Sequence, residues 1–310
     1  MKTRSGMLGL DMAAARNVCD PAVRERATVP SIADWAHARG KLVGVVSTAR
    51  LTHATPAAVY AHSEDRDWED DAASPSGCGD IARQLVQALE SGTGSRAWAF
   101  MKYYFLSSPL LHAHCPARLN SALGKINLAL GGGLRHFRTA AKGGTRNDTD
   151  LVEEFVARGG KFLASEADLE SWGAAERTLG LFSSSHMEWE QYRAGSGQPS
   201  LATMTRAALA RLAASPRGYL LVVEGGRIDH AHHHNQARKA MVETLALEAA
   251  VEAALELSSR EDTLVVVTAD HSPAVTINGY ADRGNNILGT YMDIEKVNTL
   301  MCGPQRSIFE

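Results

Sequence analysis

The stretch from Val223 to His234 concentrates the side chains of this chain that are best suited to chemistry. It carries two carboxylates, Glu224 and Asp229, and four histidines within about three helical turns. Carboxylate oxygens and imidazole nitrogens are the ligands that Zn²⁺ and Mg²⁺ take from proteins. Asp229 and His233 are four residues apart, so in a helix they share one face and can bind one ion. The alternative is a solvated polar start of a helix, and we favour the metal site.

Two predicted strands end at such side chains. Glu224 follows the apolar run Tyr219 to Val223, and Asp270 with His271 follows the run Thr263 to Thr268. Unbroken apolar, β-branched runs predict parallel strands that are buried on both faces. In open α/β sheets, ligands bind just beyond the carboxyl ends of the strands. We therefore expect the two sets of ligands to meet at one edge of one sheet.

A third predicted strand, Lys41 to Thr48, leads into a loop with further candidate ligands. The loop offers a nitrogen from His53, a hydroxyl from Thr55 and a guanidinium from Arg66. The planar arginine fork matches two phosphate oxygens. The plainer alternatives are a threonine that caps a helix and a surface arginine paired with a neighbouring aspartate. For Arg66 taken alone, the surface pair would be favoured.

The predicted elements around these strand ends indicate an α/β protein with a mainly parallel central sheet and helices on both faces. Helices are predicted from Val29 to Arg39, with Ile32 and Trp35 on its apolar face, and from Leu201 to Ala214. Asp229 to Ser258 is predicted to be one long helix. We find no repeat and no linker that would divide the chain, so we expect a single domain over residues 1–310.

Composition excludes several classes of protein. The chain has 310 residues, a hydrophobic content of 45% and a net charge of −3, so it can bury a large core and has no basic excess for nucleic acid. No run of about eighteen uncharged apolar residues predicts a membrane span. The N-terminus has a basic start but no apolar segment after it, so it is not predicted to be a secretory signal.

Taken together, the segments at the ends of the three predicted strands resemble the alkaline phosphatase family, and its animal-type branch in particular. Weaker similarity extends from about Gly6 to Asn286, except for one block. The pair Glu-Gly-Gly-Arg-Ile-Asp-His and Thr-Ala-Asp-His-Ser, in this order and spacing, is highly specific. The resembling residues are Thr52-His53-Ala54-Thr55-Pro56, Tyr60-Ala61-His62, Arg66-Asp67-Trp68, Leu130-Gly131-Gly132-Gly133, Val223 to His233 and Thr268-Ala269-Asp270-His271-Ser272.

The resemblance implies hydrolysis of small-molecule phosphate monoesters at a site with two Zn²⁺ and one Mg²⁺, through a phosphoserine intermediate. It implies one zinc on Asp229 and His233 and the other on Asp270 and His271. It implies Mg²⁺ on Thr55 and Glu224 with His53 beside it, and Arg66 on the phosphoryl oxygens. His230 and His232 would line the pocket or sit behind the ligands.

The chain also departs from the family pattern. The family's nucleophilic serine lies in an Asp-Ser-Ala motif, and this chain contains no Asp-Ser dipeptide. An upstream aspartate and a histidine near the family's C-terminus also lack counterparts. We therefore expect a single alkaline phosphatase-like domain that is truncated at both ends and inactive alone. Residues 91–124 match nothing in the family and are interpreted as an atypical insert, either a structural element or a retained intron read in frame.

The resemblance further implies a disulfide between Cys19 and Cys78, whereas two free buried thiols are the alternative. It implies an extracellular, membrane-anchored or periplasmic location and a homodimer of the complete protein. Two other functions remain open. One is a non-catalytic metal-binding protein or inactive fragment of the same fold. The other is a related phosphodiesterase or sulfatase, which lacks the pattern of Glu224 and Arg66.

Overall fold

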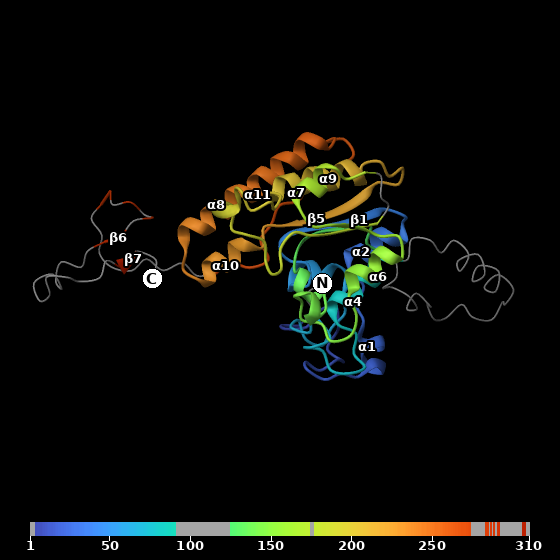
Figure 1. Ribbon diagram of the computed structural model, residues 1–310. Helices are drawn as coiled ribbons and strands as arrows, with labels where there is room; N and C mark the ends of the chain where they lie inside the picture. Colours follow the sequence, from blue (N-terminus) through green and yellow to red (C-terminus); the bar gives the residue numbers. More distant parts are fainter. Residues whose placement is uncertain are drawn as a thin grey trace, which may run out of the picture.

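The computed structural model of the protein describes residues 4–90, 125–173 and 177–273, with scattered residues between 283 and 307. The predicted insert at 91–124 lies outside these described residues. Strands and helices alternate along the chain around one main sheet (Figure 1). Such alternation is typical of an α/β protein.

The main sheet has five parallel strands in the order β3-β4-β2-β1-β5. The two central strands are apolar and almost completely buried, as expected where both faces of a parallel sheet are covered. The predicted fold class is thereby confirmed. The strands are β1 (Leu42–Arg50), β2 (Leu128–Gly132), β3 (Lys161–Leu163), β4 (Thr178–Leu181) and β5 (Tyr219–Glu224), and a separate antiparallel pair joins β6 (Thr290–Tyr291) to β7 (Arg306–Ser307).

Helices cover both faces of the main sheet (Figure 1). The side chains of β1 alternate between two layers, with Val43 and Val45 in the core under α2, α3, α4 and α6, and Val46 in the core under α9. The helices are α1 (Pro21–Ala27), α2 (Ile32–Ala38), α3 (Ala54–Tyr60), α4 (Ile81–Glu90), α6 (Leu151–Ala157), α7 (Glu166–Glu170), α8 (Glu190–Arg193), α9 (Leu201–Leu212), α10 (Arg227–His233) and α11 (Ala237–Leu257), with 3-10 turns η1 (Leu134–His136) and η2 (Ala140–Lys142).

One predicted strand is wrong. Residues Thr263 to Thr268 form no strand, and Leu264 and Val266 are 87% and 72% exposed instead of buried. In the described part of the chain β5 is the edge strand of the sheet, and this run does not pair with it. A β-branched run favours a strand only where a neighbouring strand completes its backbone hydrogen bonds.

The predicted long helix from Asp229 to Ser258 is also wrong, because it is two helices. α10 ends at His233, and α11 begins at Ala237. Between them Asn235 has a φ of 51°, in the left-handed region that asparagine tolerates better than most residues. The break makes α10 a helix of about two turns that carries Asp229 and His233.

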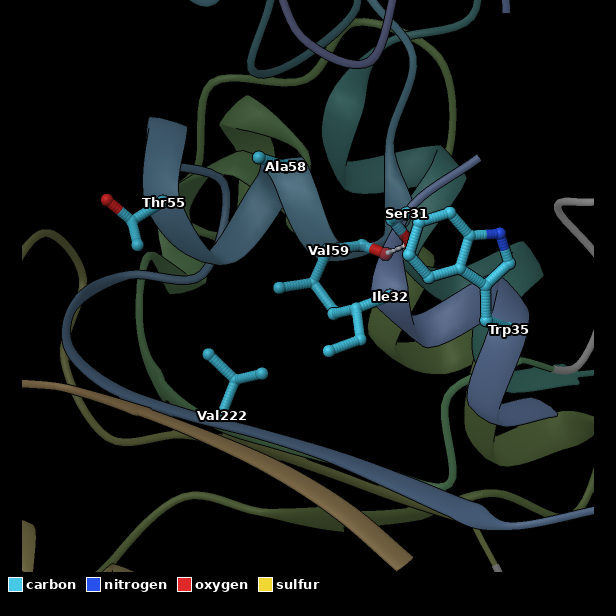
Figure 2. A pocket seen from close by; sticks show the side chains of 7 residues that line it. All are labelled: Ser31, Ile32, Trp35, Thr55, Ala58, Val59 and Val222. Carbon is cyan, nitrogen blue, oxygen red and sulfur yellow. Dashed lines mark hydrogen bonds between the residues drawn. The ribbon is translucent and has the colours of Figure 1, made fainter. Parts of the chain in front are cut away.

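Helix α2 begins later than predicted, at a capping box formed by Ser31 and Asp34. Its predicted apolar face is only partly buried, since Ile32 and Trp35 are 55% and 52% exposed. Both line an apolar cavity of about 340 Å³ between α2, α3 and β5. Figure 2 shows Val59 of α3 and Val222 of β5 at this cavity. Thr55 is the one predicted site residue in its lining.

Gly132, the last residue of β2, marks a close approach between the sheet and the loop after β4. A Cβ at this position would lie 2.2 Å from the backbone oxygen of Ser185. The backbone N–H of Gly133 donates to the oxygens of Ser183 and Ser185 at 3.0 and 2.8 Å. Glycine is therefore needed here to seat the loop that carries His186 against the end of the sheet.

We expect Gly132→Ala to lower the free energy of unfolding by about 1–3 kcal/mol, because the added methyl group overpacks backbone that has little room to move. Chemical denaturation followed by circular dichroism measures this loss. Gly173→Ala is the matched control, since nothing lies within 4 Å of a Cβ there. Equal stability of the two variants would contradict the close packing of the loop.

Candidate active site

The predicted site residues gather at the carboxyl ends of β1 and β5. His53 precedes α3 and Thr55 lies in its first turn, whereas Glu224 ends β5. Asp229 and His233 follow on α10. Since parallel strands share one direction, their carboxyl ends meet at one edge of the sheet. The sheet thus brings together groups that lie more than 170 residues apart in the sequence.

The four predicted zinc ligands come into contact there. Nε2 of His233 lies 3.4 Å from Oδ2 of Asp229, and Nε2 of His271 lies 3.7 Å from Oδ1 of Asp229 and 3.3 Å from Oδ2 of Asp270. Oδ1 of Asp229 is buried and accepts no hydrogen bond from the described residues. Such an oxygen is unfavourable unless a cation compensates for the lost water. Two carboxylates and two imidazoles in contact fit zinc.

Glu224 is the centre of a group that is rich in oxygen. Its Oε2 accepts a hydrogen bond of 2.5 Å from the hydroxyl of Ser47, and the hydroxyl of Thr55 donates a second. Burial raises the pKa of the Glu224 carboxyl, and the charges of Asp270 and Asp229 add to this rise. Hydroxyl and carboxylate oxygens suit Mg²⁺, a hard cation. Ser47 is a member of this group that the sequence did not single out.

His186 is a second site residue that sequence reasoning missed. It lies in the loop after β4, and its ring centroid is 4.1 Å from that of His230 and 5.3 Å from that of His53. The centroids of His53 and His230 are also 5.3 Å apart. One ring nitrogen from each imidazole lies within 4.8 Å of the other two. A single histidine after three serines carries no recognisable spacing, so only the fold reveals it.

The three imidazoles are neutral near pH 7. Burial lowers the pKa of His186 to about 2, and Arg50 contributes further. Burial likewise lowers the pKa of His53 to about 4, with Arg66 as the next cause, and the pKa of His230 to about 4. Each shift has the direction expected for an imidazole that loses water beside positive charge.

Arg66 reaches the same group. Its NH2 lies 3.2 Å from Nε2 of His53, and its backbone N–H donates to the oxygen of Gly6. The predicted alternative, a surface pair with Asp65 or Asp67, does not form, and Asp65 pairs with Arg16 at 2.9 Å instead. Among the described residues no carboxylate lies within ion-pair distance of the Arg66 guanidinium, which leaves it suited to an anion.

Arg50 is fixed by a network that runs into the protein interior. Its Nε and NH2 donate to Glu69 at 2.8 and 2.7 Å, and its NH1 closely contacts Nε2 of His186. Behind Glu69, His136 lies 3.3 Å from that carboxylate and 2.6 Å from Asp70. Glu69, His136 and Asp70 are all buried. The network therefore fixes the position of Arg50, and Arg50 in turn positions His186.

The remaining predicted residues lie away from these contacts. His232 is half-buried on α10, and its side chain contacts none of the described site residues. Cys19 and Cys78 form a disulfide with their Cα atoms 6.0 Å apart, which joins the segment before α1 to the loop before α4. The disulfide belongs to the frame of the domain and lies outside the ligand groups.

The chain is similar to known proteins along most of its length. The model of the alkaline phosphatase family matches residues 1–94 and 112–301. The membrane-bound alkaline phosphatase of Bombyx mori is 33% identical over 95% of this chain and 52% of its own length. The tissue-nonspecific alkaline phosphatase of Gallus gallus is 35% identical over 93% of this chain and 53% of its own length.

A solved structure agrees with these matches. The cold-active alkaline phosphatase from Shewanella sp. aligns with a TM-score of 0.54 and 25% identity, over 82% of this chain and 46% of that chain. This chain spans about half the length of the curated relatives that it matches. The matched residues include every strand of the main sheet and both sets of candidate zinc ligands. The chain belongs to the alkaline phosphatase family.

Proposed function

We propose that this chain carries most of the metal and phosphate ligands of a phosphatase that hydrolyses small-molecule phosphate monoesters. The observation that supports this best is the approach of two ligand pairs from different parts of the sequence. His271 lies 3.7 Å from Asp229, although the two residues are 42 positions apart. The family is metal-dependent, and a donor set of this kind suits divalent cations.

We assign the metals as the resemblance to the family implies, and the chemistry of the donors agrees with this assignment. Asp229 and His233 would hold one Zn²⁺, and Asp270 and His271 a second. Thr55 and Glu224 would hold Mg²⁺, with His53 beside it. When bound, such ions act as Lewis acids that stabilise the attacking and leaving oxygens of a phosphoryl transfer. The orphaned Oδ1 of Asp229 and the hydroxyl groups around Glu224 support this division.

Arg66 would bind the phosphoryl group of the substrate. A guanidinium fork can donate to two oxygens at once, and Arg66 has no described carboxylate partner to compete with the substrate. His53 contacts Arg66 and restricts the position of its guanidinium. Arg66 would therefore orient the phosphoryl group relative to the metal ligands and offset its negative charge.

The nucleophile is the missing part of this assignment. The phosphoserine mechanism requires a serine beside the metals, and the chain lacks the Asp-Ser motif in which the family places it. Ser47 does not replace that residue, because it is fully buried and its hydroxyl donates a hydrogen bond to Glu224. We propose that the isolated chain binds metals and phosphate but does not turn over. A non-catalytic metal-binding protein with the same fold is the second candidate.

We also propose that the complete protein is an extracellular, membrane-anchored or periplasmic homodimer. The Cys19–Cys78 disulfide favours an oxidising compartment. One relative carries the description membrane-bound. None of the helices in the described residues is long and apolar enough to cross a membrane.

Zinc should stabilise the folded chain, because only the folded state brings the four ligands together. At free zinc about 100 times the dissociation constant, we expect a gain of roughly 2.7 kcal/mol. A thermal melt with and without zinc measures it. Asp270→Ala should remove most of the gain, whereas the control Glu252→Ala on the exposed side of α11 should keep it. Full stabilisation of Asp270→Ala by zinc would argue against this ligand.

The purified 310-residue chain, loaded with zinc and magnesium, should be nearly inactive on p-nitrophenyl phosphate. The reason is that the chain contains no Asp-Ser motif, and that the hydroxyl of Ser47, which lies beside Glu224, is fully buried. Release of p-nitrophenolate measures turnover. Robust activity that Asp270→Ala abolishes would show that the chain supplies its own nucleophile and that our assignment of the missing serine is wrong.

Arg66→Ala should weaken the binding of inorganic phosphate to the zinc-loaded chain by about 10- to 100-fold, the loss expected for a charge-assisted, two-pronged contact. Equilibrium dialysis with labelled phosphate gives the affinity. Arg206→Ala is the control, because Arg206 pairs with Glu256 on the surface. An unchanged affinity in Arg66→Ala would remove Arg66 from the phosphate site.

A further inference from the structure

The histidine–arginine cluster is a group of side chains beside the proposed phosphate site that the function does not fully use. Its imidazoles lie in the segments that follow three different strands of the sheet, and each imidazole contacts an arginine. All six side chains are at least partly accessible. The cluster consists of His53, His186, His230, Arg50, Arg66 and Arg227.

The contacts fix which ring nitrogens can accept hydrogen bonds. Nε2 of His53 faces NH2 of Arg66 at 3.2 Å, and Nδ1 of His230 faces NH1 of Arg227 at 3.4 Å. Both ring nitrogens of His186 face Arg50, because Nδ1 accepts from its backbone N–H at 3.2 Å and Nε2 lies 2.5 Å from its NH1. A neutral imidazole has one acceptor nitrogen and one N–H donor. In His53 and His230 the acceptor nitrogen faces the arginine, so the other nitrogen of each of these two rings is a donor.

This arrangement suits an anion better than a metal ion. The spacing of the three imidazoles alone would allow a metal. However, a metal-binding histidine normally donates its second nitrogen to a carboxylate or carbonyl, whereas here an arginine donor lies against each ring. Burial lowers the pKa of His186 most, Arg50 is the neighbouring charge that acts most strongly on it, and Arg227 adds a weaker effect in the same direction. A divalent cation is repelled by this field, and an oxyanion is attracted.

The two arginines not used in the proposed function are held in place. Glu69 occupies Nε and NH2 of Arg50 and leaves NH1 directed at His186. The guanidinium of Arg227 lies over the ring of Trp189, with 3.6 Å from its carbon to the ring centroid. Nε of Arg227 is buried and has no hydrogen-bond acceptor among the described residues. Arg227 is thus a cation that Trp189 and His230 hold in one position.

We propose that Arg50, Arg227, His186 and His230 form a second anion subsite, which binds a carboxylate or phosphoryl group elsewhere on the substrate. The inference rests on the proposed function, because it assumes that Arg66 binds the transferred phosphoryl group. His53 lies between the two subsites and contacts Arg66 on one side and His186 and His230 on the other. The preferred substrates are therefore phosphate monoesters whose alcohol part carries a second negative charge.

A matched pair of phosphonates tests the subsite without turnover. Phosphonopropionate carries a carboxylate at the end of its chain, and propylphosphonate carries a neutral methyl group there. On the zinc-loaded 310-residue chain, we expect the carboxylate to strengthen binding by about tenfold or more, the effect of a charge-assisted hydrogen bond. Isothermal titration calorimetry gives both affinities.

Two variants locate the effect. His186→Asn keeps an acceptor for the Arg50 amide but removes the imidazole, and Arg227→Gln removes the cation. Each should bring the affinity ratio of the two ligands close to one and leave the affinity for propylphosphonate almost unchanged. His234→Asn is the control, since His234 is exposed at the end of α10, and it should keep the wild-type ratio. A thermal melt of each variant confirms that it is folded.

The possible results distinguish a failure of the second subsite from a failure of the proposed function on which it rests. If both phosphonates bind the wild-type chain equally well, the second subsite is wrong and the phosphate site stands. If neither binds, the proposed function fails and the inference fails with it. Zinc content provides a third readout. Loss of one bound zinc in His186→Asn, measured by equilibrium dialysis, would identify the cluster as a metal site and overturn the proposal.

Discussion

The parallel pairing of β1 with β5 is the constraint on which the candidate site depends. Its register sets Ser47 opposite Glu224, so the hydroxyl and the carboxylate lie side by side and form a hydrogen bond of 2.5 Å. From this pair the chain leads to His53 on one side and to Asp229 on the other. A slip of one residue would turn one partner to the opposite face of the sheet and separate the two ligand sets.

A buried ion pair supplies the second constraint. Long side chains such as that of Arg50 lie beside the site, and they keep one position only where another group holds them. Arg50 would sample many rotamers without Glu69, and Glu69 is itself buried and held by the hydroxyl of Thr52. Burial alone would raise the pKa of the Glu69 carboxyl, yet the hydrogen bonds from Arg50 lower it overall. The ion pair therefore keeps the Glu69 carboxylate charged and restricts Arg50 to one position.

The candidate ligands can be recognised in the sequence more readily than the residues that surround them. Asp229 with His233, and Asp270 with His271, are visible as short-range patterns after apolar runs. The structure places both pairs together. Ser47 and His186 carry no such pattern, because each acquires its neighbours only when distant strands align. The run Thr263 to Thr268 has the composition of a strand, but it does not pair with β5, the edge strand in the described part of the chain. The prediction of one long helix fails for a local reason. The break is caused by one left-handed residue, Asn235, and hydrophobic periodicity cannot detect it.

The neighbouring charges that shift the pKa values have opposite signs on the two sides of the site. The site therefore has a negative pole at Glu224 and a positive pole at His186. Burial is the largest cause throughout. At Glu224 the neighbouring carboxylates of Asp270 and Asp229 add to the rise, whereas at His186 the guanidiniums of Arg50 and Arg227 add to the fall. The neighbouring charges are therefore negative around Glu224 and positive around His186.

Each pole is unfavourable without a ligand of the opposite charge, since like charges are gathered where water is partly excluded. Cations relieve the repulsion among the carboxylates, and an anion relieves that among the guanidiniums. A phosphate ester can do both at once, because its oxygens can face bound cations on one side and arginine N–H groups on the other. In the proposed function, the same arrangement of charge would favour a phosphorylated ligand.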